Sequence, residues 1–257
     1  MITKNLVKYI HSLNLKKHRD AQHCFVAEGP KVITDLLPLI PCKALYATED
    51  FLQAANPNLL RKAKLVETVK QADLERLSLL RSPRGGIAIF EIPSCEAEAD
   101  NSMASLPLNN LCLALDGIQD PGNLGTIIRI ADWFGIEHIF ASLDTADAYA
   151  PKVIQATMGA IGRVHIHYVD LPKFLKCLDL NTPVFGTFLD GSNIYQQNLT
   201  KTGIIVMGNE GNGISPAVAQ CVTHKLLIPN FPEDRLTSES LNVAVATAIV
   251  CAEFRRG

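Results

Sequence analysis

The chain has 257 residues, of which 47% are hydrophobic and 19% charged, a composition typical of packed globular proteins and not of disordered ones. Its formal net charge of −2 by itself indicates no particular partner, and its length is enough for one large domain or two modest ones. No apolar stretch approaches the length of a membrane span, and the N-terminus lacks the apolar core of a secretory signal.

Positive charge gathers in the first part of the chain. Residues 1–95 contain 14 Lys and Arg against 9 Asp and Glu, whereas residues 96–257 contain 10 against 17. The density is highest at Lys16, Lys17 and Arg19. A solvated helix end would explain this cluster, and so would a surface that contacts a nucleic acid backbone.

The first hundred residues alternate between strands and helices. Short buried strands are predicted at residues 24–29, 43–48 and 87–92, and an apolar stripe predicts a helix at 29–38. Residues 1–95 are therefore expected to form a small α/β domain. Residues 92–110 mix Pro, Ser, Asn and acidic side chains without apolar periodicity, which indicates an interdomain linker. We place this linker at residues 96–107.

After the linker, the alternation is clearer. Strands are predicted at residues 111–116, 136–142 and 164–169, and the segments 184–192, 203–211 and 225–230 each lead from a strand into a loop. Helices are predicted at 123–135, 150–162 and 238–256. This order predicts an α/β fold with a mostly parallel sheet covered on both faces. Ligands of such sheets bind at the carboxyl ends of the strands.

The loop after the first of these later strands reads DGIQDPGNLGTIIR, residues 116–129. Pro121 and Gly122 predict a turn, and Asn123 is suited to cap the helix that follows. Arg129 lies six residues further along and is expected on a similar face of that helix. Taken alone, the segment is an ordinary junction between a strand and a helix, with a solvated arginine.

A glycine-rich loop follows the apolar residues 204–207. It reads GNEGNG, without the GK[ST] of a P-loop and without the GxGxxG spacing of a dinucleotide site. Glu210, in the middle of the loop, would repel a phosphate. The loop therefore suits a neutral or cationic ligand, although a tight connection between strand and helix explains the glycines equally well.

The third loop spans residues 228–242. Ser238 or Ser240 is expected to cap the last helix, with Asn242 in its first turn. None of the serines lies in a GxSxG motif and no histidine has an evident partner, which argues against a Ser-His-Asp hydrolase. His165 and His167 alternate along a predicted strand and are interpreted as structural. The seven cysteines are scattered without a CxxC pair, which predicts reduced thiols in the cytoplasm and no metal site.

Together, the order and spacing of the three loops resemble the motifs of the SpoU/TrmH branch of the SPOUT methyltransferases. The matching segments are NLGTIIRIADWFG, VMGNEGNGIS, and IPN followed by ESLNVAVATAI, within residues 108–257. The segment LNLKKHRDAQHCFVAEGPKVITDLL is similar to the RNA-binding extension that precedes this domain in many rRNA members. The resemblance implies an N-terminal RNA substrate-binding domain, residues 1–95, and a methyltransferase domain closed by a C-terminal trefoil knot, although protein chains rarely knot.

Members of this family use S-adenosylmethionine to methylate a ribose 2′-hydroxyl in ribosomal or transfer RNA, and they are homodimers. The resemblance implies that the cofactor is bound at Thr187, Gly208, Asn209, Gly211, Ile228 and Leu241. Because the cofactor carries a sulfonium cation, the acidic Glu210 is compatible with it. The implied RNA contacts are phosphate contacts of Lys16, Lys17 and Arg19.

The central catalytic role in the family belongs to the arginine of the first motif, which is Arg129 in this sequence. A guanidinium rarely deprotonates, so we interpret Arg129 as a phosphate clamp that stabilises the developing alkoxide. In a dimer it could serve the partner's active site. The other implied catalytic positions, which would orient neighbouring groups, are Asn123, Glu210, Ser240 and Asn242.

The third motif departs from the family pattern, because residues 230–239 lack the usual glycine and are several residues longer. Two alternatives therefore stay open: a tRNA 2′-O-methyltransferase, and a catalytically silent RNA-binding protein that acts in assembly. The retained motif residues favour an enzyme. The large N-terminal domain favours ribosomal RNA of the 23S type as the substrate, by analogy.

Overall fold

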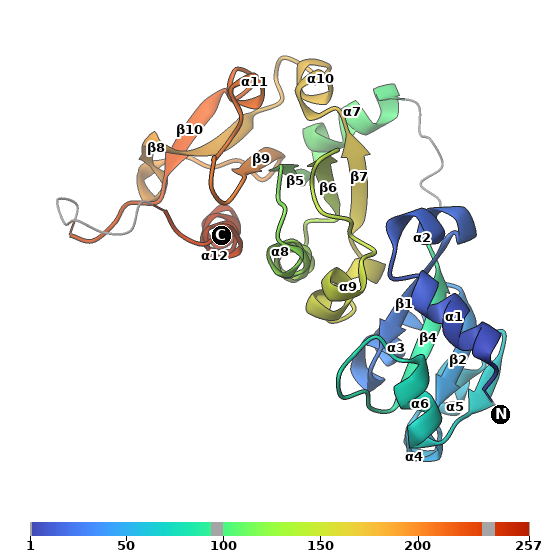
Figure 1. Ribbon diagram of the computed structural model, residues 1–257. Helices are drawn as coiled ribbons and strands as arrows, with labels where there is room; N and C mark the ends of the chain where they lie inside the picture. Colours follow the sequence, from blue (N-terminus) through green and yellow to red (C-terminus); the bar gives the residue numbers. More distant parts are fainter. Residues whose placement is uncertain (1, 94–99, 233–239, 257) are drawn as a thin grey trace. The chain divides into compact units, whose positions relative to one another are not determined.

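The computed structural model describes residues 2–93, 100–232 and 240–256 (Figure 1). Contacts between its elements divide the chain into two compact units, each described by itself here. The N-terminal unit comprises Met1–Ser94 and Asp147–Arg163, and the C-terminal unit comprises Cys95–Ala146 and Val164–Gly257. The chain therefore passes between the units three times. The division of function between an RNA-binding domain and a methyltransferase domain stays a prediction.

The N-terminal unit is built on a four-stranded sheet with the order β1-β4-β2-β3. Strand β4 is antiparallel to β1 and β2, whereas β3 is parallel to β2. The three strands expected from the sequence are confirmed. The strands are β1 (Cys24–Glu28), β2 (Cys42–Ala47), β3 (Val66–Thr68) and β4 (Gly86–Glu91). The helices are α1 (Lys4–Ser12), α2 (Lys16–Gln22), α3 (Pro30–Leu36), α4 (Glu49–Ala54), α5 (Pro57–Leu60), α6 (Gln71–Leu77) and α9 (Pro151–Thr157), with a 3-10 turn η1 (Ala160–Gly162).

The segment 147–163 packs into the N-terminal unit, although it lies in the middle of the predicted methyltransferase domain. The ring of Tyr149 lies 5.2 Å from that of Phe25 in β1. Gly159 has a φ of +93°, and a Cβ there would lie 2.7 Å from the Cβ of Asp35 in α3. The helix predicted at 150–162 is wrong in length, because Met158 and Gly159 adopt left-handed conformations that end it.

The C-terminal unit contains a six-stranded sheet with the order β10-β8-β9-β5-β6-β7, in which every neighbouring pair is parallel. This confirms the predicted parallel α/β sheet. Its strands are β5 (Leu111–Asp116), β6 (His138–Ser142), β7 (His165–Val169), β8 (Val184–Asn193), β9 (Gly203–Gly208) and β10 (His224–Leu227). Its helices are α7 (Asp100–Asn109), α8 (Pro121–Trp133), α10 (Leu171–Lys176), α11 (Pro216–Ala219) and α12 (Val243–Arg255), with a 3-10 turn η2 (Ile194–Gln196).

Helices cover both faces of this sheet (Figure 1). On one face, α7, α10 and α11 pack on a core that includes Cys112, Ala114 and Val206, and α8 and α12 lie on the other. These two helices run side by side in the same direction. Asn242, before α12, donates to Asn123 in the first turn of α8, and Arg255, at the end of α12, donates to the carbonyl that follows α8. Both helices therefore begin at the same edge of the sheet.

Two further predictions about local structure are wrong. Most of the predicted linker is helix α7, whose Met103 and Leu106 pack against the sheet core. The segment 184–192 does not lead into a loop, because strand β8 continues to Asn193, and Ser192 and Asn193 pair with β10. None of the described helices combines the length and apolar character needed to cross a lipid bilayer. Within the described ranges, no three His, Cys, Asp or Glu side chains are grouped so as to hold a metal ion.

Candidate active site at the junction of β5 and β9

The strand order of the C-terminal sheet reverses between β5 and β9. The chain continues from β5 to β6 and β7 on one side, while β9, β8 and β10 form the other side. In open α/β sheets, ligands bind at the carboxyl ends of the strands at such a switch point. Asp116, which ends β5, is paired in register with Gly208, which ends β9. The loops after these two strands, residues 116–120 and 209–215, therefore emerge side by side.

The side chain of Asn209 joins these two loops. Its Nδ2 donates to the carbonyl of Gly117 at 2.7 Å, and its Oδ1 accepts from the amides of Gly211 and Asn212 at 2.9 and 3.0 Å. A second link runs from the amide of Ser215 to Asp116 Oδ2, at 2.7 Å. The glycine-rich loop is thus folded on its own asparagine and fixed to the neighbouring strand end.

Three of the predicted catalytic residues form one chain of hydrogen bonds. Asn123 Nδ2 donates to Glu210 Oε1 at 2.9 Å, and Asn242 Nδ2 donates to Asn123 Oδ1 at 2.9 Å. Each residue comes from a different loop of the three predicted from the sequence. The Glu210 carboxylate can only accept a hydrogen bond, so Asn123 must direct its Nδ2 toward Glu210 and its Oδ1 toward Asn242. This determines the orientation of the Asn123 amide. The structure brings these residues together, while their catalytic role stays a prediction.

Two predictions about helix caps are wrong. Asp120, not Asn123, caps α8: its Oδ1 accepts from the amide of Asn123 at 2.8 Å, and Pro121 is the first helical residue instead of part of a turn. Asn242 caps α12, with its Oδ1 accepting from the amides of Ala244 and Val245. Of the two serines expected there, Ser238 lies outside the described residues and Ser240 lies before the cap. Because Asn123 does not serve as the cap, its side-chain amide is available to donate to Glu210.

Arg129 does not join this hydrogen-bonded chain. Its side chain is exposed and makes no hydrogen bond or ion pair with any described residue. The expectation that it shares a face with Asn123 is wrong, because six residues at about 100° each amount to about 600°, which leaves the two side chains about 120° apart around the helix. Arg129 instead follows the exposed stripe of α8 that ends at Trp133, whose side chain is 84% exposed.

The other predicted positions are distributed around the same edge. Ile228 follows the end of β10, and Leu241, 49% exposed, precedes the α12 cap next to the exposed Ser240. Thr187 does not end its strand as predicted, but it is the first β8 residue beyond the pairing with β9, which stops at Gly186. A Cβ on Gly208 would lie 2.3 Å from the backbone carbon of Gly213, so the loop closes back on this glycine.

Of the RNA contacts predicted at α2, those of Lys16 and Lys17 stay predictions. Lys16 and Lys17 are exposed, but Arg19 is buried with 2% exposure. Its guanidinium donates to the carbonyls of Leu13 and Asn14 and pairs with Asp147 within the same unit. Arg19 is therefore a structural residue and the prediction that it binds phosphate is wrong. Sequence alone could not show this, because the carboxylate partner lies 128 residues away.

The charge of the two loops at the switch point is entirely acidic. Residues 116–120 and 208–215 contain Asp116, Asp120 and Glu210 and no Lys or Arg. Asp116 and Asp120 were not predicted as site residues, although an Asp followed by Pro is a recognisable helix start. A phosphate would find no cation in these loops, whereas a cationic or hydroxyl-bearing ligand would find carboxylates and backbone groups.

The fold and the site define an α/β protein with two acidic, hydrogen-bonded loops at the carboxyl edge of its parallel sheet, where ligands of such sheets bind. Residues 110–252 match the SpoU rRNA Methylase family, and residues 4–88 match the MRM3-like substrate binding domain. The family match covers more than half of the chain. The chain belongs to the SpoU rRNA methylase family and is an RNA methyltransferase.

Individual relatives span nearly the whole chain. The 23S rRNA (guanosine(2553)-2′-O)-methyltransferase RlmP of Bacillus subtilis is 28% identical over 253 residues, which are 97% of this chain and 95% of the relative. The structure of a TrmH-family protein from Porphyromonas gingivalis is 39% identical, with a TM-score of 0.84 over 100% of this chain and 99% of the other. An AdoMet-bound rRNA methyltransferase from Sinorhizobium meliloti is 28% identical, with a TM-score of 0.84 over 100% and 96%.

Proposed function

We propose that the protein transfers the methyl group of S-adenosylmethionine to a ribose 2′-hydroxyl of ribosomal RNA of the 23S type. One observation carries this proposal beyond the family: Asn123, Glu210 and Asn242 come from three separate loops and meet in one hydrogen-bonded chain at the switch point of the sheet. The name of the Bacillus subtilis relative, a 23S rRNA 2′-O-methyltransferase that spans 97% of this chain, supports the same substrate class.

The residues at the switch point fit this cofactor. Its sulfonium is positive and its ribose offers hydroxyl donors, and the surrounding loops supply carboxylates and no cation. When bound, S-adenosylmethionine supplies the activated methyl group. The pre-folded glycine loop would hold it through backbone groups, which cost no reorganisation on binding. The positions proposed to hold it are Thr187, Gly208, Asn209, Gly211, Ile228 and Leu241.

The chain's own residues then orient the RNA ribose. A hydroxyl needs an acceptor for its proton and a donor for the charge that develops on its oxygen. The Glu210 carboxylate is held toward the site by Asn123, which Asn242 holds in turn. The unpaired guanidinium of Arg129 is suited to clamp an RNA phosphate and to stabilise the alkoxide. Ser240, two residues before Asn242, is proposed to position the same groups.

We further propose a homodimer in which Arg129 serves the site of the partner subunit. Arg129 points away from Asn123 on its own helix, yet it shares the exposed face of α8 with Trp133. An indole that is 84% exposed on a rigid helix is the kind of residue that anchors protein interfaces. The C-terminal trefoil knot and a cytoplasmic location belong to the same proposal. The free thiols of the six described cysteines suit a reducing compartment.

The test compares wild type with Arg129→Ala and with a matched control, Lys201→Ala. Lys201 is an exposed cation just before β9, at the end of that strand opposite to the proposed site. Calorimetry measures binding of S-adenosylmethionine, and transfer of labelled methyl groups into ribosomal RNA measures activity. We expect Arg129→Ala to lose methyl transfer while cofactor affinity stays within about threefold. Loss of cofactor binding instead would show that Arg129 has a different role.

Mapping 2′-O-methyl sites in total RNA with and without the gene identifies the substrate. A missing mark in ribosomal RNA supports the proposal, and a missing mark in transfer RNA supports the alternative enzyme. If wild type binds no S-adenosylmethionine at millimolar concentration, the protein is an RNA-binding assembly factor and the proposed reaction is refuted.

A further inference from the structure

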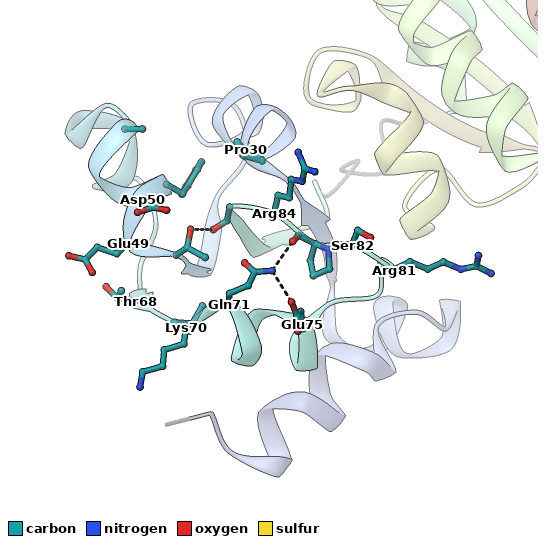
Figure 2. A pocket seen from close by; sticks show the side chains of 16 residues that line it. Pro30, Glu49, Asp50, Thr68, Lys70, Gln71, Glu75, Arg81, Ser82 and Arg84 are labelled. Atoms are coloured by element: carbon teal, nitrogen blue, oxygen red, sulfur yellow. Dashed lines mark hydrogen bonds between the residues drawn. The ribbon is translucent and has the colours of Figure 1, made fainter.

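An open groove of about 1220 Å³ crosses one end of the sheet in the N-terminal unit (Figure 2). It lies where the carboxyl ends of β2 and β3 meet the amino end of β4, and all of its lining residues belong to this unit. It is separate in sequence from every residue assigned to methyl transfer. A groove of this size is larger than most small-molecule sites, so an extended segment of polymer would fill it better.

One side of the groove is a short loop with two arginines. Arg81 and Arg84 are exposed, and neither forms an ion pair with any described residue. Between them, Pro83 is buried and its carbonyl accepts from Gln71 Nε2 at 3.1 Å. Figure 2 shows the two guanidinium groups projecting from this loop in different directions.

The loop that carries the arginines is fixed at both ends. Before it, the buried Glu28 accepts hydrogen bonds from the hydroxyl of Ser78 and the amide of Leu79. After it, the carbonyl of Gly85 accepts from the amide of Thr48 at 2.7 Å. Gly85 has a φ of +76°, and a Cβ there would lie 2.6 Å from Pro30 Cγ. The arginines therefore project from a pre-formed frame.

The other side of the groove is acidic. Glu49 and Asp50 occupy the first turn of α4 and are exposed (Figure 2). Carboxylates in a first turn also stabilise the helix itself. They also place hydrogen-bond acceptors on this side of the groove, across from the loop that carries the two arginines (Figure 2). Pro30 and the largely buried Phe51 also line the groove, so part of its wall is apolar.

We propose that this groove binds a short unpaired segment of the RNA substrate, with its backbone phosphates on Arg81 and Arg84 and the N–H edge of one base on Glu49 and Asp50. The inference rests on the proposed RNA substrate. A duplex would bring phosphates against the carboxylates, whereas a single unstacked nucleotide has one anionic end and one end that can donate.

The carboxylates also predict which bases bind. An ionised carboxylate only accepts hydrogen bonds, so it favours bases whose edge carries an amino group, as cytosine, adenine and guanine do. Uracil offers one N–H flanked by two carbonyls, and those carbonyls face the carboxylates unfavourably. The groove should therefore bind amino-bearing bases in preference to uracil.

The test measures fluorescence anisotropy of labelled single-stranded RNA heptamers, oligo(C) and oligo(U), with the full chain. We expect wild type to bind oligo(C) at least about threefold more tightly than oligo(U). A double variant, Arg81→Gln with Arg84→Gln, should weaken both heptamers about tenfold and reduce the salt dependence. A second, Glu49→Gln with Asp50→Asn, should abolish the preference for oligo(C). Equal binding of the two heptamers by wild type would overturn the base-reading side of the proposal.

A matched control removes two exposed cations of the same unit outside the groove, Arg61→Gln with Lys62→Gln. Weakening by the control equal to that of the arginine variant would overturn the groove as a site and leave only general electrostatics. Melting temperatures of the arginine variant and of the control should match wild type, because those side chains are exposed, whereas the acidic variant should melt slightly lower because it loses the first-turn carboxylates of α4.

A third readout separates this inference from the proposed function. Each groove variant should bind S-adenosylmethionine as wild type does and should methylate ribosomal RNA with a raised KM and an unchanged kcat. An unchanged KM in the arginine variant, with methylation intact, would refute the groove and leave the methyltransferase standing. Absence of cofactor binding and of methylation in wild type itself would refute the function, whatever the heptamers show.

Discussion

Asn242 holds two roles that substitution can separate. Its Oδ1 caps α12 by accepting from the amides of Ala244 and Val245, at 3.0 and 3.3 Å, while its Nδ2 donates to Asn123 at 2.9 Å. Asn242→Ala removes both roles. Asn242→Asp keeps the acceptor, and adds a negative charge that a helix N-terminus favours, but it removes the donor to Asn123.

The expected magnitudes differ accordingly. Loss of an asparagine cap costs about 1 kcal/mol, which for a chain of this size lowers Tm by about 2–4 °C. Asn242→Ala should show this decrease and Asn242→Asp should not. A net hydrogen bond contributes about 0.5–1.5 kcal/mol, so loss of the bond to Asn123 should lower kcat/KM by about two- to tenfold in both variants. In the aspartate variant, repulsion from Glu210 should lower it further.

Thermal denaturation measures the cap, and methyl transfer into ribosomal RNA measures the hydrogen-bonded chain. Full activity in Asn242→Asp would show that the chain through Asn123 does not contribute to the reaction. An unchanged Tm in Asn242→Ala would show that the cap geometry contributes nothing to stability. Either result refutes the corresponding half of the reasoning without affecting the other half.

Three further predictions follow from single positions. Gly208→Ala would place a Cβ 2.3 Å from the backbone of Gly213, so cofactor affinity measured by calorimetry should fall more than about tenfold; unchanged affinity would contradict the proposed role of this loop. Trp133→Glu should convert the proposed homodimer to a monomer in light scattering and lose activity; a dimer that persists would contradict the interface. Burial raises the pKa of Glu28 above its ordinary value of 4.5, and two hydrogen bonds only partly offset this. Because the folded protein then holds the proton more tightly, the contribution of Glu28 to the free energy of unfolding is greatest below pH 4.5 and decreases as the pH rises through its folded pKa. Urea denaturation should therefore show wild type losing stability relative to Glu28→Gln over that range, and parallel pH profiles would contradict the assignment.

The parallel sheet was predictable because its strands are buried on both faces. Residues 111–116 and 203–208 are continuous apolar runs bounded by polar loops, and such runs separated by helices indicate a parallel sheet. Helix α7 was missed because it carries Pro107 and few apolar residues, of which Met103 and Leu106 face the core. Local pattern is informative only where burial is extensive.

The site was predictable only through the family resemblance. Asn123 and Glu210 lie 87 residues apart, and Asn242 lies 119 residues from Asn123, so no periodicity connects them. The resemblance carried over residue types but not geometry: it placed Arg129 with Asn123, and the turn of the helix separates them. Arg19 was misassigned for a similar reason, because a charge in the sequence reveals neither its burial nor a distant partner.

Residues 147–163 belong to the N-terminal unit, although they lie within the sequence of the C-terminal unit. This restricts how the chain can be truncated or recombined. A fragment ending near residue 95 would lack Tyr149 against Phe25 and would leave the buried guanidinium of Arg19 without Asp147; an unpaired buried charge costs about 3–5 kcal/mol. The N-terminal unit is therefore not a detachable module. Swapping it between enzymes requires a second graft, seventeen residues long, in the middle of the methyltransferase sequence.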